Sequence, residues 1–302
     1  MPWRAAGYVR KPPDHTGLLI TMTNLRDKAD LFHSLHTRES RPLVLANAWD
    51  VASALLVEEA GAEAVATTSA GVAWSLGAPD GDRLDRDRAL DLVARIAAAV
   101  RVPVTADIES GFGDTPEALA ETVRGVIEAG AVGVNIEDTV RDGATPALRP
   151  AGEQAARIAA ARAAADAAGV PLYINARVDV YLRGAGDPET RLAETLERAA
   201  AYRDAGASGI FVIGAPDSGT ITALVKGVGL PLNVPCGPGA PPVGELAALG
   251  VARVSAGADL AAAAYGLARR AARELYQEGT YTALAGGVEF GEINGLLARG
   301  EG

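Results

Sequence analysis

Pro103-Val-Thr-Ala-Asp107-Ile-Glu109-Ser-Gly111-Phe-Gly113 is an apolar run that ends in two carboxylates and two glycines. It has the pattern of a buried strand, and because strand side chains alternate between faces, Asp107 and Glu109 are expected to point the same way. The residues that follow, Asp114-Thr115-Pro116, have the form of a helix start, with either of the first two as N-cap. The stretch therefore predicts a strand–helix unit with acids at the carboxyl end of the strand, where parallel α/β proteins bind ligands.

Two sequence phrases related to this unit recur along the chain. In the first, a proline leads an apolar strand, and the four prolines are Pro42, Pro103, Pro171 and Pro231. In the second, a glycine closes a helix before the next strand, as at Gly61, Gly130, Gly206 and, more loosely, Gly250. Four strands of each kind, each followed by an amphipathic segment, predict an α/β fold of the closed (β/α)8 TIM barrel type rather than an open doubly wound sheet.

The remaining segments are assigned around this barrel. Residues 1–22 are expected to be a flexible N-terminal extension, and residues 23–302 a single barrel domain that includes a C-terminal helical tail. Asn24 to Thr37 has apolar residues at near-helical spacing, which predicts a helix on the bottom of the barrel, with its histidines as surface or packing residues. Thr139 to Gly152 is expected to be a mobile lid whose glycines and prolines prevent helix and strand.

Composition narrows the class of partner. The chain has 302 residues and a formal charge of −10 without a basic patch, which favours a small-molecule partner over nucleic acid. The single cysteine, Cys236, excludes an intrachain disulfide, fits a reducing compartment and is interpreted as a packing residue. No apolar run approaches the roughly 20 residues of a membrane helix. We therefore expect a cytoplasmic protein with no membrane partner.

The positions of histidine and lysine narrow the chemistry further. All three histidines precede the first predicted strand, and the lysines are Lys11, Lys28 and Lys226. A histidine-ligated zinc site, a Ser-His-Asp triad in the barrel and a Schiff-base lysine are therefore disfavoured. The carboxylates that remain at the strand ends are oxygen ligands, which select a hard cation such as Mg²⁺ or Mn²⁺.

Further polar residues stand at the ends of the next predicted strands, in Asn135-Ile-Glu137, Asn175-Ala-Arg177 and at Asn233. Polar groups inside a barrel are costly unless they are hydrogen-bonded or serve a site. In one interpretation the asparagines tie neighbouring strand ends together and Arg177 neutralises an acid. We favour a metal-and-carboxylate site, because three acids at adjacent strand ends would repel one another without a cation.

Five motifs, in this order, resemble those of the isocitrate lyase/phosphoenolpyruvate mutase superfamily over about residues 25 to 280. They are Thr68-Ser69-Ala70-Gly71, Leu76-Gly-Ala-Pro79-Asp80, Thr105 to Gly113, Asn135-Ile-Glu137-Asp138 and Asn175-Ala-Arg177-Val-Asp179. The resemblance implies a Mg²⁺-dependent barrel that makes or breaks C–C or C–P bonds next to a 2-oxo acid, through an enolate of pyruvate type. It also implies a homotetramer, built as a dimer of dimers, in which the C-terminal helix is exchanged between protomers.

The resemblance assigns roles to individual residues. The implied metal ligands, direct or through water, are Asp107, Glu109, Glu137 and Asp80. The implied substrate-binding residues are Thr68, Ser69, Ala70, Asn135, Arg177 and Asn233. Among these, Arg177 would clamp a carboxylate bidentately, and the hydroxyl and backbone N–H groups of residues 68–70 would hold the substrate carboxylate and the enolate oxygen. Arg177, Asp80 and Thr68 form the implied catalytic set.

Two departures from the lyase branch shape the functional hypotheses. The stretch from Thr139 to Pro150 has neither the cysteine nor the histidine of the lyase loop, and Ile213-Gly214 stands where lyase relatives place a glutamate. The preferred hypothesis is a Mg²⁺-dependent lyase or decarboxylase acting on a small 2-oxo or 2-hydroxy dicarboxylate. The alternatives are a phosphonopyruvate mutase or hydrolase, and a non-catalytic barrel that binds a 2-oxo acid.

Overall fold

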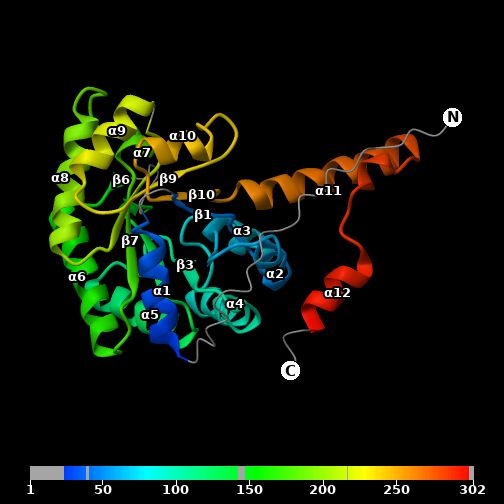
Figure 1. Ribbon diagram of the computed structural model, residues 1–302, viewed down its shortest axis with the longest axis horizontal. Helices are drawn as coiled ribbons and strands as arrows, with labels where there is room; N and C mark the ends of the chain where they lie inside the picture. Colours follow the sequence, from blue (N-terminus) through cyan, green and yellow to red (C-terminus); the bar gives the residue numbers. More distant parts are fainter. Residues whose placement is uncertain (1–23, 39–40, 142–146, 216, 299–302) are drawn as a thin grey trace.

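Parallel strands form a barrel that is surrounded by helices (Figure 1). The computed structural model describes residues 24–38, 41–141, 147–215 and 217–298. The barrel strands are β1 (Leu43–Leu45), β2 (Val65–Ala66), β3 (Val104–Asp107), β4 (Gly133–Glu137), β7 (Tyr173–Val178), β8 (Gly209–Val212), β9 (Leu232–Pro235) and β10 (Arg253–Ser255).

The strands pair in the order β1-β10-β9-β8-β7-β4-β3-β2. A parallel bridge between Ala48 and Thr67 joins the two outer strands. There the N–H of Ala48 donates to the Ala66 carbonyl at 2.8 Å, and the N–H of Thr68 donates to the Ala48 carbonyl at 3.1 Å. The eight-stranded sheet therefore closes on itself, and the predicted (β/α)8 barrel is confirmed.

The helices around the barrel follow the predicted phrases. They are α2 (Val51–Glu59), α3 (Ser69–Ser75), α4 (Arg86–Ala99), α5 (Pro116–Glu128), α6 (Ala151–Ala167), α7 (Val180–Arg183), α8 (Arg191–Asp204), α9 (Ser218–Gly227) and α10 (Val243–Ala248). The four glycines of the second phrase follow α2, α5, α8 and α10 with φ between 87° and 100°, a left-handed conformation that costs a glycine little. Thr115 caps α5 by accepting from the N–H of Ala118 at 3.2 Å.

Helix α1 (Leu25–Leu35) packs beside β7 at the bottom of the barrel, as predicted. Its Phe32 is fully buried and meets Tyr173 edge to face. The ring of His36 stacks on Tyr173 with centroids 3.8 Å apart, and its Nδ1 lies 2.7 Å from the Phe32 carbonyl oxygen. His33 Nε2 lies 2.9 Å from the Pro171 carbonyl oxygen. Both histidines are thus packing residues that fasten α1 to the barrel.

Acid is expected to loosen this contact, because burial lowers the pKa of His36 to about 2, and Arg253 adds to the effect. The unfolded chain takes up the proton below pH 6.5 while the folded chain does not. The contribution of His36 to the free energy of unfolding should therefore fall by up to about 1.4 kcal/mol per pH unit below pH 6.5. Between pH 7 and pH 5, urea unfolding should show the wild type losing stability relative to His36→Gln, and an unchanged difference between the two proteins would contradict the prediction.

The C-terminal helix α11 (Asp259–Glu278) projects away from the barrel (Figure 1). Within it only Ala261 and Ala271 are buried, and Tyr276 is 86% exposed. A 3₁₀ turn, η1 (Thr282–Leu284), and α12 (Phe290–Ala298) follow, and α12 returns to pack on α2 through the buried Leu296. Much of α11 therefore lacks a packing partner within the described part of this chain.

The segment after β4 differs from its prediction. β5 (Thr139–Val140) and β6 (Ala147–Leu148) form an antiparallel pair, and Gly152 lies in the first turn of α6. The expectation that this stretch forms neither strand nor helix was therefore wrong. Thr139 and Val140 are β-branched and favour a strand. In the sequence, Gly143 and Pro146 stand between β5 and β6 rather than within them. Residues 142–146, on which the lid prediction also rests, lie outside the described residues, as does the predicted extension 1–22.

No helix among the described residues is long and apolar enough to cross a membrane.

Candidate active site

Acids and an arginine meet at the carboxyl ends of adjacent strands. Asp107 ends β3, Glu137 ends β4, and Glu137 is in register with Arg177 on β7. Parallel pairing aligns these strand ends, so side chains from three parts of the sequence reach one edge of the barrel. This part of the predicted site is assembled as expected.

Glu109 reaches the same edge by a different route from the predicted one. β3 ends at Asp107, and Glu109 lies in the following turn with φ 53°, so strand alternation does not orient it. Its Oε2 accepts the N–H of Gly81 at 2.8 Å and also the N–H of Asp82. Burial has the largest effect on Glu109 and raises its pKa to about 7, although the hydrogen bond from the N–H of Asp82 lowers it. The turn thus joins the acid to the loop after β2.

Glu137 lies between two arginines. Arg177 Nη1 is 2.6 Å from Oε2 and Arg141 Nη2 is 2.7 Å from Oε1, the latter as an ion pair without the alignment of a hydrogen bond. The Glu137 side chain is only 1% exposed. Burial raises its pKa to about 8, an effect that outweighs the opposing charges of Arg177 and Arg141. The arginines therefore only partly offset the cost of an ionised carboxylate here.

Arg177 is held by an acid of its own strand end. Its Nε and Nη2 donate to the Asp179 carboxylate at 2.7 and 2.8 Å, and Thr139 Oγ1 donates to the same carboxylate at 2.5 Å. The bidentate edge that was expected to clamp a substrate carboxylate is thus occupied by Asp179. The guanidinium has five N–H groups, so one on each terminal nitrogen is left for a ligand.

Asp138 supports this arrangement and was missed as a site residue. Its carboxylate accepts the N–H of Asp179 at 2.9 Å, the hydroxyl of Tyr202 at 2.9 Å and an N–H of Arg198 at 3.2 Å. Burial raises its pKa above the usual range. The sequence did contain a sign of this role. Successive side chains of a strand point to opposite faces, so Asp138, which follows Glu137, is expected to point away from the site and toward the helices.

The asparagines make the strand-tying contacts of the alternative interpretation. Asn135 Oδ1 accepts from Asn175 Nδ2 at 2.9 Å and from Arg253 Nη2 at 3.2 Å. Asn233 Nδ2 donates to Ser255 Oγ at 3.1 Å. Both predicted substrate-binding asparagines are buried and joined to neighbouring strands, so any contact with a ligand must come in addition to these bonds.

The Thr68-Ser69-Ala70 segment enters the site at the start of α3. The N–H of Ser69 donates to Asp107 Oδ2 at 3.3 Å, while Thr68 and Ala70 are buried. Asp80 is exposed in the next loop, where its charge contributes to the raised pKa of Glu109. Its neighbour Asp82, which the motif reading missed, accepts the N–H of Ser110 at 3.3 Å. The loop thus brings two acids to the edge of the site.

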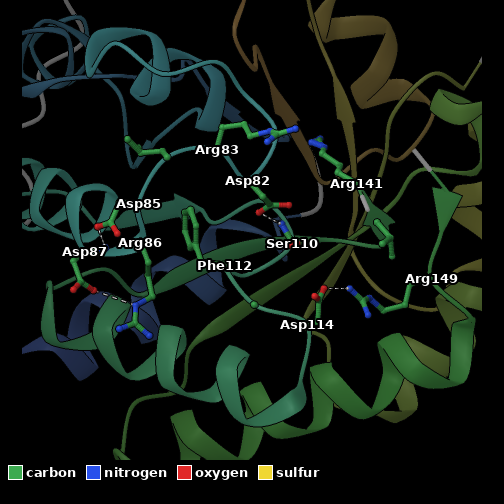
Figure 2. A pocket seen from close by; sticks show the side chains of 14 residues that line it. Asp82, Arg83, Asp85, Arg86, Asp87, Ser110, Phe112, Asp114, Arg141 and Arg149 are labelled. Carbon is green, nitrogen blue, oxygen red and sulfur yellow. Dashed lines mark hydrogen bonds and ion pairs between the residues drawn. The ribbon is translucent and has the colours of Figure 1, made fainter. Parts of the chain in front are cut away.

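A cavity of about 550 Å³ opens beside these acids. Figure 2 shows Asp82, Arg83 and Arg141 along one side of it, with Ser110 and Phe112 nearby. Asp82 and Arg141 line the cavity, and both also contact the Glu109 carboxylate. The N–H of Asp82 donates to it, and Arg141 Nη1 lies 4.0 Å from its Oε2. The cavity therefore gives solvent a route to the acid cluster.

The acid cluster fits a hard divalent cation in chemistry, since all its donors are oxygens. In this structure the acids are not arranged as a complete set of metal ligands. The described residues include no group of three acidic, histidine or cysteine side chains placed to hold a metal ion. Arg141 and Arg177 supply the positive charge at Glu137 instead. Cys236 is half-buried against the core, and burial raises the pKa of its thiol, as its interpretation as a packing residue requires.

Comparison with known proteins agrees with this geometry. The family model of phosphoenolpyruvate phosphomutase matches residues 32–276. The chain belongs to this family. The family lies in the isocitrate lyase/phosphoenolpyruvate mutase superfamily of C–C lyases and mutases, so the resemblance inferred from the motifs is confirmed and the chain is an enzyme of lyase type.

Individual relatives of this phosphomutase-family chain span several activities. A crystal structure of a candidate lyase/mutase from Burkholderia cenocepacia J2315 is 44% identical, with a TM-score of 0.84, covering 91% of this chain and 96% of that one. The 2-methylisocitrate lyase of Escherichia coli K12 is 34% identical over 220 residues, 70% of this chain and 69% of that protein. A phosphonopyruvate hydrolase solved with oxalate and Mg²⁺ is 27% identical, with a TM-score of 0.78, covering 91% of this chain and 96% of that one.

Proposed function

We propose that the protein is a Mg²⁺-dependent lyase or decarboxylase that cleaves a C–C bond of a small 2-oxo or 2-hydroxy dicarboxylate. The observation that carries this proposal is the meeting of Asp107, Glu137 and Arg177 at adjacent strand ends, beside the start of α3. Carboxylate side chains bind hard cations, and arginine binds carboxylates. The site could therefore hold both a divalent cation and a carboxylate group of such a substrate.

Asp107, Glu109, Glu137 and Asp80 would hold Mg²⁺ or Mn²⁺, directly or through water. When bound, the cation acts as a Lewis acid that favours negative charge on the carbonyl oxygen of a 2-oxo acid. The oxalate and Mg²⁺ in the phosphonopyruvate hydrolase structure support this assignment by analogy.

The protein's own groups orient the substrate. Arg177 binds a substrate carboxylate through its terminal nitrogens, while Asp179 keeps the guanidinium in place. The N–H groups of Thr68 and Ser69 already donate to the Ala48 carbonyl and to Asp107, so the hydroxyls of these two residues and the N–H of Ala70 are the donors that would bind the oxygen that gains charge as the bond breaks. Fixed donors of this kind each contribute about 10²-fold or more to rate. For a 2-oxo dicarboxylate, the carboxylate carbon leaves as CO₂ without the bonding electrons, which move to the enolate of the 2-oxo acid, and solvent later supplies a proton to the enolate carbon. For a 2-hydroxy dicarboxylate, the hydroxyl loses its proton to a base of the site, its carbon becomes the 2-oxo carbon, and the bonding electrons move to the enolate of the other carboxylate fragment, which solvent then protonates.

A second candidate function is phosphonate chemistry, in which a C–P bond replaces the C–C bond. The match to the phosphomutase family model favours it, as does the absence of cysteine and histidine from Thr139 to Pro150. A pyruvate-type enolate forms both from phosphonopyruvate and from a 2-oxo dicarboxylate, so the two candidates share Asp107 and Arg177 and differ in the leaving group.

A substrate screen separates these candidates. The purified protein is incubated with Mg²⁺ and either oxaloacetate, a 2-alkylmalate or phosphonopyruvate. The release of pyruvate or another 2-oxo acid, and the conversion of phosphonopyruvate to phosphoenolpyruvate, are followed against a metal-free control and a control with Mg²⁺ but no protein. We expect metal-dependent turnover of a dicarboxylate. Turnover of phosphonopyruvate alone would establish the second candidate, and binding of 2-oxo acids without any turnover would indicate a non-catalytic barrel.

We also propose that the chain assembles as a homotetramer, a dimer of dimers that exchanges α11. Helix α11 leaves the barrel with Leu275 51% exposed, and apolar surface of this kind favours a protein partner. Light scattering at micromolar concentration should give about four times the chain mass of 30.8 kDa. Leu275→Asp should lower that mass while the exposed-site control Glu278→Gln does not. A monomeric wild type would contradict the proposal.

A further inference from the structure

Arg141 occupies an unusual position against the acid cluster. It directly follows β5, and its guanidinium lies 2.7 Å from Glu137 Oε1 and 4.0 Å from Glu109 Oε2. The side chains of the two acids are 1% and 3% exposed, whereas that of Arg141 is 19% exposed and lines the cavity in Figure 2. Arg141 therefore covers both acids on the side that faces solvent.

The acids do not depend on Arg141 for all of their contacts. Glu137 keeps Arg177 on its other oxygen, and Glu109 keeps the N–H groups of Gly81 and Asp82. The side chain of Arg177 is 11% exposed and is fastened to Asp179, so it is the fixed partner of Glu137. Arg141 is the partner that has room to leave, because the cavity lies beside it.

A divalent cation at these acids would compete directly with Arg141. A metal ion on Glu137 Oε1 would need the place that Arg141 Nη2 fills, and it would be a third positive charge beside Arg177 and Arg141, which would both repel it. Arg141 also packs closely on Gly81, where an added Cβ would stand 3.0 Å from Arg141 Nη1.

We propose that Arg141 and the divalent cation are alternative counterions of the Glu109–Glu137 pair, so that a metal ion binds only when Arg141 leaves the acids. This inference rests on the metal site of the proposed function and adds a coupling to it. By linkage, whatever holds Arg141 on the acids weakens metal binding, and metal binding releases Arg141 by the same factor.

Metal affinity tests the coupling. Mn²⁺ binding is measured by electron paramagnetic resonance on the wild type, Arg141→Gln, Arg141→Lys and Arg83→Gln. Arg83 is an exposed residue of the same cavity, and its substitution removes the same charge. Arg141→Gln should bind Mn²⁺ about 10-fold more tightly or better. Arg141→Lys should fall nearer the wild type, and Arg83→Gln should stay within about 3-fold of it.

A second measurement uses the wild type alone. Phenylglyoxal modifies accessible arginines, and mass spectrometry gives its rate at each site. Saturating Mg²⁺ should speed the modification of Arg141 and leave Arg83 unchanged. This experiment keeps the proposal testable if a variant does not fold.

The outcomes separate the inference from the function on which it rests. Mn²⁺ binding to the wild type with equal or weaker binding to Arg141→Gln overturns the alternation and leaves the metal site standing. Slower modification of Arg141 in Mg²⁺ does the same. If neither the wild type nor Arg141→Gln binds Mn²⁺, the metal site of the proposed function is itself wrong, and the alternation is wrong with it.

Discussion

Asp107→Asn lowers the metal-dependent kcat/KM by about 10³-fold or more, and the fold stays intact. The carboxylate ends β3, and its contacts with the described residues include two long hydrogen bonds, from Ser69 N–H to Oδ2 at 3.3 Å and from Glu109 N–H to Oδ1 at 3.4 Å. The amide retains the shape and one acceptor oxygen, so it keeps one of these two bonds, and the loss of one long hydrogen bond leaves the fold intact. It loses the negative charge that a hard cation requires, and a metal-ion contribution of several kcal/mol corresponds to a rate factor of this size.

The control for Asp107→Asn is Asp114→Asn, which removes an acid that is 82% exposed just beyond the same strand. Steady-state kinetics with the best substrate of the screen, together with Mn²⁺ affinity, should place Asp114→Asn close to the wild type. Retention of both Mn²⁺ affinity and turnover in Asp107→Asn would remove Asp107 from the proposed metal site.

Arg177→Gln is expected to reduce both activity and stability. The guanidinium is the cation between Glu137 and Asp179, whose side chains are 1% and 0% exposed. Removing one partner of a buried ion pair typically costs about 3–5 kcal/mol, and the low end is expected because Arg141 still contacts Glu137. Loss of a charged donor to the substrate carboxylate should also lower kcat/KM by about 10²-fold or more.

Two further variants separate these effects. Arg183→Gln removes a nearby arginine that contacts Thr139 Oγ1 at 3.1 Å rather than the acids, so it should change unfolding and kinetics little. Arg177→Lys keeps the charge without the planar fork and should recover stability more than activity. Urea midpoints and kcat/KM values measure the two effects. Wild-type kinetics in Arg177→Gln would show that the substrate carboxylate is bound elsewhere.

The barrel could be predicted because its signals are local. A proline that leads an apolar run and a glycine that ends a helix depend on the backbone of a few adjacent residues, and the glycines of the second phrase do take positive φ. The hairpin of β5 and β6 was missed for a related reason. Glycine and proline mark a break but not its exact position, and pairing between Thr139 and Leu148 depends on residues on both sides of that break.

The chemical character of the site was also visible in the sequence. Asp107, Glu137 and Arg177 stand at predicted strand ends, and parallel strands must bring such ends to one edge. Which of these side chains bind one another could not be predicted from the sequence. Arg177 binds Asp179 through its bidentate edge, so that edge is not free for a ligand. This pairing depends on side-chain geometry that the spacing of residues does not specify.

The sequence by itself therefore determined the closed barrel, the set of strand-end acids and the family, because each follows from local backbone preference and from the order of residue types. Only the tertiary structure decided how the charges are satisfied. Glu109 meets Gly81, 28 residues away, through a left-handed turn, and Asp138 meets Tyr202 across 64 residues. Arg141 Nη1 comes within 4.0 Å of Glu109 Oε2, which lies in the turn after β3. Such contacts join segments that are distant in sequence, and each depends on where the whole barrel places its loops.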